Sequence, residues 1–210
     1  MLAMPALATG ALMTLELTSV AIVIGLFLGL FLALGRLSKN MIYNKLSSLY
    51  IWFFRGTPLL VQIMFIYYAL PMFTPISPNS LTSAFIALGL NSGAYLAEII
   101  RAAIQSIDKG QMEASKALGM SYSQAMRSIV IPQSYRRLIP PVGNEFIALL
   151  KDSSLVSCIA MTELLRQTTI LSNSQATPIY YIPCIIFYLL LTSIFTFIFG
   201  RLEKKYSVYE

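Results

Sequence analysis

The sequence predicts an all-α integral membrane protein with about five transmembrane helices. Of its 210 residues, 57% are hydrophobic and only 11% are charged, whereas a soluble domain carries about a quarter charged residues. Several apolar runs reach the length of roughly 20 residues that a helix needs to cross a bilayer. No linker or low-complexity tract divides the chain, so we expect a single transmembrane domain over residues 1–210.

Five spans account for the apolar runs in chain order. The first covers about 11–35, the second 50–72, the third 81–104, the fourth 137–158 and the fifth 178–200. No lysine or arginine precedes the first run, and this run is longer than the apolar core of a signal peptide. We therefore expect it to be a retained span.

Basic residues indicate which ends of the spans face the cytoplasm. They gather after the first span, between the third and fourth spans, and after the fifth: Arg36, Lys39, Lys45, Lys109, Lys116, Arg127, Arg136, Arg137, Arg201, Lys204 and Lys205. The loop of residues 73–80, between the second and third spans, carries no charge. The positive-inside rule then predicts that the N-terminus lies outside and the C-terminus lies in the cytoplasm.

Two features of the spans leave alternatives open. Thr57 followed by Pro58 is a helix-start signal inside the second span, with Thr57 as N-cap and Pro58 at the first helical position. Either residues 41–54 form a separate helix along the inner surface, or one continuous helix is kinked at Pro58. Gly25 and Gly29 have the spacing that allows close helix packing in membranes, or they are flexible filler.

Residues 108–132 are polar, although they lie between two long apolar runs. Asp108–Gln111 and Ser121–Gln124 both have the form of a capping box, which marks a helix start. Gly119 stands where the first of these helices should end, because glycine tolerates the left-handed backbone that closes a helix. The segment therefore predicts two short cytoplasmic helices, the second of which is stopped by Pro132.

Apolar side chains on these short helices suit a contact with another protein. They are Met112, Ala117, Leu118, Tyr122 and Met126. Such a helix pair can dock in a groove of a partner protein or lie on lipid headgroups. We favour docking.

The same stretch resembles the EAA loop of permease subunits of ABC importers. The family pattern is Glu-Ala-Ala, three residues, Gly, nine residues and Ile-x-Leu-Pro. Here Glu113-Ala114-Ser115 is followed by Gly119 and then by Ile129-Val130-Ile131-Pro132 at the same spacing. Further segments are similar to the polar amino-acid branch of that family: Arg55 to Gln62, Tyr95 to Arg101, Pro132-Gln133, and Lys151 to Leu155.

This resemblance implies a multi-pass subunit of the prokaryotic cell membrane that pairs with itself or with a similar permease. It also implies two cytoplasmic ATP-binding cassette subunits and an extracytoplasmic solute-binding protein. The coupling contact would fall on the EAA residues and the turn after them: Glu113, Ala114, Ser115, Leu118, Gly119 and Met120.

The chain itself is not expected to be an enzyme. No G-x-x-x-x-G-K-[ST] motif occurs in it, so ATP and Mg²⁺ would be bound by the partner subunits. With no histidine and two scattered cysteines, neither a metal site nor a cofactor is expected. The net charge of +6 indicates cytoplasmic anchoring next to membrane lipid, and no nucleic-acid partner is expected.

Ionisable residues at membrane depth are the candidates for a solute site. Glu98 lies one helical turn before Arg101, so it either pairs with that arginine or takes a solute's ammonium group, with Asn91 and Tyr95 on the same face. We include Glu98 in the predicted site.

A second cluster lies in the fourth span. Lys151, Asp152 and Ser154 would lie about 20 Å along that span at 1.5 Å per residue, where Lys151 either pairs with Asp152 or Glu145 or meets the solute. Glu163 follows at the outer side as a lid or a contact for a binding protein.

The outer half of the chain has a slight acidic excess, which favours a basic solute. Glu16, Asp152 and Glu163 stand against Lys151 and Arg166. The expected function is import of polar or basic amino acids (arginine, lysine or histidine) by alternating access. The alternative is an ion-coupled secondary transporter or a channel subunit. Such a protein would not need a cytoplasmic pair of capped helices.

Overall fold

The computed structural model describes residues 3–207, and all regular structure within them is helical. The α-helices are α1 Ala3–Leu37, α2 Met41–Gly56, α3 Leu59–Met64, α4 Leu70–Phe73, α5 Ser80–Gln105, α6 Lys109–Ala117, α7 Tyr122–Ala125, α8 Ile131–Asp152, α9 Leu164–Ser174 and α10 Tyr181–Ser207. Two π-helical segments, Phe65–Ala69 and Met126–Val130, and two 3₁₀ segments, Ser153–Ile159 and Pro178–Tyr180, complete the chain. The prediction of an all-α membrane fold is confirmed.

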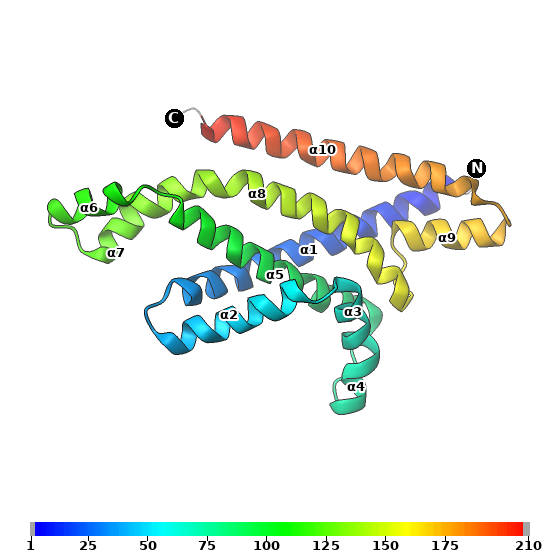
Figure 1. Cartoon of the computed structure of the whole chain (residues 1–210). Coiled ribbons are helices and arrows are strands. Elements are labelled where there is room, and N and C mark those ends of the chain that lie inside the picture. The colour runs from blue at the N-terminus through cyan, green and yellow to red at the C-terminus, as the bar shows by residue number, and fades with distance from the viewer. Residues whose placement is uncertain (1–2, 208–210) are drawn as a thin grey trace.

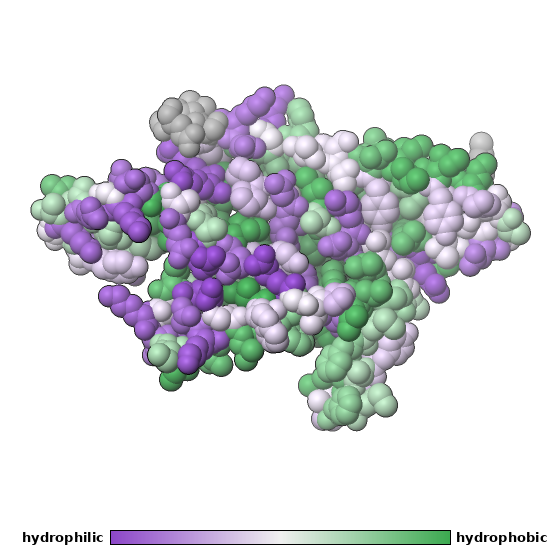
Figure 2. Space-filling model, viewed as in Figure 1, coloured by the Kyte–Doolittle hydropathy of each residue, from purple (hydrophilic) through white to green (hydrophobic). Residues whose placement is uncertain are grey.

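The long helices α1, α5, α8 and α10 form an elongated bundle, with α2 alongside (Figure 1). Helices α6 and α7 lie at one end of this bundle, and the N-terminus and α9 lie at the other. The pair α3–α4 projects steeply from the bundle. Apolar side chains cover the first half of α10 and α3–α4, whereas the C-terminal end of α10 and the centre are hydrophilic and the α6–α7 end is mixed (Figure 2).

By length and composition, three of the described helices can cross a membrane: α1, α5 and α10. A fourth span results if the bent pair formed by α2 and α3–α4 counts as one. Helix α8 coincides with most of the predicted fourth span but carries Arg136, Arg137, Asn144, Glu145 and Lys151. A helix that faces a polar cavity can be less apolar than one that faces lipid, so the count of five spans stays a prediction.

Small residues bring α1 and α5 into close contact. A Cβ atom added to Gly25 would lie 2.9 Å from Ser92 Oγ, and one added to Gly29 would lie 2.9 Å from Leu96 Cβ. On the facing helix, a Cβ atom added to Gly93 would lie 2.9 Å from the Leu28 side chain. The glycine pair therefore serves close packing, one of the two interpretations left open by the sequence.

The second predicted span is broken, not kinked. Thr57 and Pro58 are both extended, and the helices before and after them differ in direction by 103°. The predicted N-cap is wrong, because the Thr57 hydroxyl donates back to the Phe53 carbonyl at 2.8 Å and Pro58 itself occupies the N-cap position of α3. Thr57 thus ends α2 and does not begin α3.

The α6–α7 segment has the predicted helix pair with its predicted turn. Asp108 accepts a hydrogen bond from Gly110 N, and a full capping box starts α7 at Ser121. Gly119 has a φ of +78°, with its N–H donating to Lys116 O at 2.9 Å and the next N–H donating to Ser115 O at 3.0 Å. These two bonds form a Schellman closure, which requires the left-handed conformation.

Two details of this segment differ from expectation. Gln111 does not close a capping box, because its side-chain oxygen accepts from Gln133 Nε2 at 3.3 Å. Pro132 does not stop a helix, since α7 continues through the π-helical segment Met126–Val130 into α8. Proline is tolerated here because it closely follows the π-helical segment, where the regular α-helical hydrogen-bond ladder is already interrupted.

Candidate functional site

A cavity of about 510 Å³ opens where the break between α2 and α3 faces α5 and α8. Its volume lies in the range of small-molecule sites. The lining consists of the α2–α3 connection and single faces of α5 and α8: Arg55, Gly56, Thr57, Pro58, Leu59, Asn91, Tyr95, Glu145, Ala148, Leu149 and Asp152. The break itself therefore forms one wall of the cavity.

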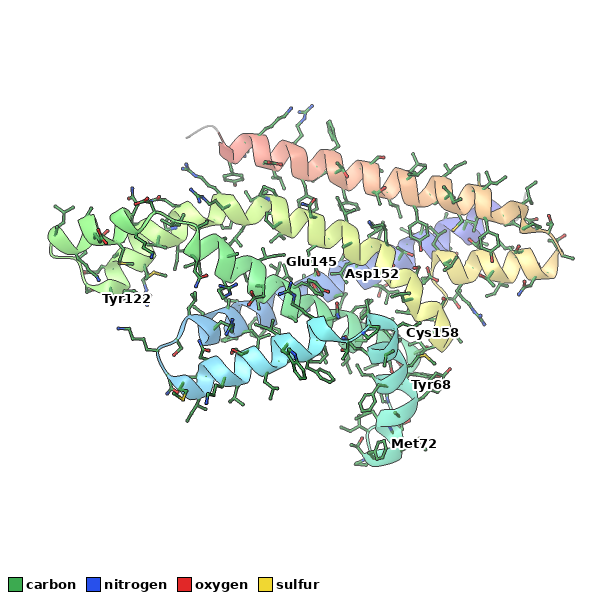
Figure 3. The ribbon with its side chains drawn as sticks, viewed as in Figure 1. Tyr68, Met72, Tyr122, Glu145, Asp152 and Cys158 are labelled. Atoms are coloured by element: carbon green, nitrogen blue, oxygen red, sulfur yellow. The ribbon has the colours of Figure 1, made fainter. Side chains whose placement is uncertain are left out.

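The cavity combines one cation with two carboxylates. The Arg55 guanidinium lies over the Tyr95 ring, 5.1 Å from its centroid. Glu145 and Asp152 are two turns apart on α8 and so project from the same face of that helix (Figure 3). Glu145 Oε1 accepts a hydrogen bond from Ser92 Oγ at 2.9 Å, which fixes this carboxylate against α5.

Three of the predicted solute residues line this cavity: Asn91, Tyr95 and Asp152. Arg55 is not among the predicted solute residues, because it enters the sequence analysis only as the start of the family-like segment Arg55 to Gln62. Glu145 was considered only as a partner for Lys151. A cation beside a break in a span and an acid seven residues before another on one helix are the signals that would have found both.

Glu98 lies in a second cavity, of about 590 Å³, whose lining also includes Arg55, Tyr95 and Arg101. Its Oε2 atom is 2.6 Å from Arg101 Nη2, and its Oε1 atom is 3.6 Å from Arg36 Nε. The pairing interpretation of Glu98 is therefore realised. Its contact with solute stays a prediction.

The remaining predicted solute residues lie outside both cavities. Glu163 is fully buried, caps α9 by accepting from Leu165 N and Arg166 N at 2.7 Å each, and accepts from Tyr188 Oη at 3.2 Å. Ser154 is half-buried in the 3₁₀ segment after α8. Lys151 is exposed, and within residues 3–207 it forms no ion pair with Asp152 or Glu145.

A second candidate surface lies on α6 and α7. Leu118 is 83% exposed and Tyr122 is 64% exposed. Tyr122 lies at the far end of the molecule (Figure 3). Glu113, Ala114 and Gly119 are also exposed. By contrast, Ser115 is buried, where its hydroxyl donates to Gln111 O at 2.6 Å, and Met120 is half-buried. The segment thus presents an apolar tip next to an acidic side chain.

A helical membrane fold with a charged central cavity and a capped helix pair at one end defines a membrane transport permease. The family described as binding-protein-dependent transport system inner membrane component matches residues 21–208. The chain therefore belongs to that family.

Its relatives are permeases of amino-acid transporters. The chain is 40% identical over 209 residues to the glutamine transport system permease protein of Escherichia coli strain K12, covering 98% of this chain and 95% of that protein. It is 41% identical over 215 residues to the arginine transport system permease protein of Corynebacterium glutamicum, covering 96% of this chain and 68% of that protein.

Solved structures show the same fold. A crystal structure of an amino acid ABC transporter with histidines matches at 40% identity with a TM-score of 0.92, over 96% of this chain and 94% of that one. The MetNI methionine ABC transporter in an inward-facing conformation matches with a TM-score of 0.84 at 19% identity, a likeness of fold alone.

Proposed function

We propose that this chain is the permease subunit of an ATP-driven importer of polar or basic amino acids, with the 510 Å³ cavity as its solute site. The observation that carries the proposal is the lining of that cavity, in which Arg55 faces the same space as Glu145 and Asp152. A free amino acid needs one cationic and one anionic contact. Arg55 would take its carboxylate and one of the two acids its ammonium group.

The second acid supports a cationic side chain on the solute. Once one carboxylate is used for the α-ammonium group, the other remains for arginine, lysine or histidine. Glutamine would find the same main-chain contacts, with Asn91 and Tyr95 available for its amide. The names of relatives that transport glutamine and arginine are consistent with both classes of solute.

Energy for transport would come from partner subunits. Two ATPase subunits would bind ATP and Mg²⁺ and seat the exposed tip at Leu118 and Tyr122 in a surface groove. A second permease copy, or a similar permease, would complete the translocation path, and a solute-binding protein would deliver the amino acid from outside. Closure of the ATPase pair would then alternate access to the cavity, and the partner complex would hydrolyse the ATP.

Binding of radiolabelled amino acids to the complex assembled with its ATPase tests the proposal. We expect Asp152→Asn to weaken arginine binding roughly tenfold to hundredfold, because a hydrogen bond to a charged group is worth about 1.5–3 kcal/mol. Glutamine binding should change less. Glu16→Gln, which removes an exposed carboxylate on α1 away from the cavity, is the matched control and should bind arginine normally.

Two results would contradict the proposal. The first is unchanged arginine affinity in Asp152→Asn. The second is solute uptake that continues without ATP, which would favour a secondary transporter or channel. Co-purification of an ATPase whose turnover responds to this subunit would support the ABC assignment.

A further inference from the structure

Gln62 is a buried polar side chain at the break between α2 and α3. Only 6% of it is exposed, although it stands in an apolar stretch. Its Nε2 atom donates to Phe54 O at 2.9 Å, to Thr57 O at 3.1 Å and to Thr57 Oγ1 at 2.8 Å. Its Oε1 atom accepts from Asn91 Nδ2 at 3.0 Å. Its NH₂ group is therefore directed at the acceptors of the break, and its carbonyl oxygen is bonded to α5.

These bonds satisfy the end of α2. The last carbonyl groups of a helix have no partner within the helix, and the proline that follows here has no N–H to offer. The Phe54 carbonyl oxygen accepts a hydrogen bond from Gln62 Nε2 and a second one, at 3.2 Å, from Asn91 Nδ2. Without such donors, an interruption at membrane depth leaves carbonyl groups unsatisfied at a considerable cost. Gln62 and Asn91 together make the break stable in one geometry.

The stabilised break is also the wall of the solute cavity. Residues Arg55 to Leu59 line that cavity along their whole length. Gln62 and Thr57 also border a separate, apolar cavity of about 540 Å³ lined by Phe53, Phe54 and Ile66 among others. Gln62 is not among the described residues that line the solute cavity, so it reaches that cavity only through the backbone it holds and through Asn91.

We propose that Gln62 is a positioning residue for solute binding: its amide locks the break between α2 and α3 and Asn91 on α5 in the geometry that forms the cavity wall. This inference rests on the proposed solute site. If the lock is lost, the break samples other conformations. The apparent dissociation constant then rises by the inverse of the fraction of molecules that keeps the binding geometry.

The test compares Gln62→Leu and Gln62→Glu with wild type in the complex assembled with its ATPase. Gln62→Leu removes the donors and the acceptor at similar volume. Gln62→Glu keeps the shape and an acceptor for Asn91 but has no NH₂ group for Phe54 and Thr57. We expect both to weaken binding of radiolabelled arginine roughly tenfold. Uptake in proteoliposomes should show a higher KM with the saturating rate retained.

Thr168→Val is the matched control. Thr168 is fully buried in α9, and its hydroxyl donates to Leu164 O at 2.8 Å, so the variant loses a buried polar group remote from the break. It should bind arginine with wild-type affinity. If the Gln62→Leu variant does not assemble, the isosteric Gln62→Glu variant is compared with wild type and with Thr168→Val instead.

Three outcomes would overturn the inference: wild-type affinity in the Gln62 variants, a lower saturating rate at unchanged KM, or an equal loss in Thr168→Val. Asp152→Asn measured in parallel separates this inference from the proposed function. Weaker arginine binding in Asp152→Asn with normal binding in the Gln62 variants rejects the positioning role alone. Normal binding in Asp152→Asn rejects the solute site itself.

Discussion

At the scale of single residues, the charged groups within the helix bundle divide into those that have partners and those that face the cavity. Glu98 is bonded to Arg101 and lies near Arg36, and Glu163 caps α9. Arg36 also donates to Asn44 and Ser48 on α2, so the Glu98 cluster joins α1, α2 and α5. Within residues 3–207, Arg55 and Asp152 form no salt bridge. These two remain available for a solute.

Glu98→Gln should lower stability more than solute affinity. Glutamine can accept a hydrogen bond but leaves Arg36 and Arg101 without a carboxylate, which we expect to cost about 1–3 kcal/mol. Thermal unfolding of the detergent-solubilised complex would show a lower midpoint. Because the double variant Glu98→Gln with Arg101→Gln also removes one orphaned charge, it should recover part of the loss. Normal stability together with lost arginine binding would instead assign Glu98 to the solute.

At the scale of helices, some local signals predicted well, whereas the predictions of the Thr57 cap and the Gln111 capping box were wrong and the contacts between distant segments were not predicted. The Schellman closure at Gly119 and the capping box at Ser121 depend on a few neighbouring residues, so the sequence was enough. The break at Thr57 was recognised, but its direction was not. That direction depends on Gln62 and Asn91, which meet across 29 positions of the sequence. Likewise, Glu145 lines the cavity only because of the way in which α8 packs against α5.

Gly119→Val should uncouple ATP hydrolysis from transport. A Cβ atom at this position meets nothing within 4 Å, so the cost comes from the left-handed backbone alone, about 1–2 kcal/mol for a side chain. Loss of the turn would move Leu118 and Tyr122 relative to each other, so that both could no longer contact the ATPase at once. Uptake should fall relative to ATP hydrolysis while membrane insertion is retained, as measured by transport assay, ATPase assay and immunoblot.

Gly119→Asn is the matched variant, because asparagine tolerates the left-handed conformation better than other side chains. It should keep more transport activity than Gly119→Val. Equal activity of both variants at the wild-type level would show that the turn is not needed for coupling.

At the scale of the whole molecule, the basic segments gather at one end. The connection between α1 and α2, the α6–α7 pair and the C-terminal end of α10 all lie there, and much of that end is hydrophilic (Figures 1 and 2). These segments hold several of the basic residues that the sequence assigns to the cytoplasm, among them Lys39, Lys109 and Lys204. The fold thus brings three separate stretches of charge to one side, as the positive-inside rule requires. Orientation itself stays a prediction.

Cysteine labelling in intact cells would decide the orientation. Asn79, in the connection before α5, and Ser123, on α7, are both exposed, so neither cysteine would be shielded by the protein itself. With the N-terminus outside, Asn79→Cys should react with an impermeant reagent in intact cells, and Ser123→Cys should react only after the membrane is opened. The unmodified chain, whose Cys158 is half-buried and Cys184 buried, gives the background. The reverse pattern would place α6 and α7 outside the cell. No cytoplasmic ATPase could reach them there, so the coupling assignment would fall with the topology.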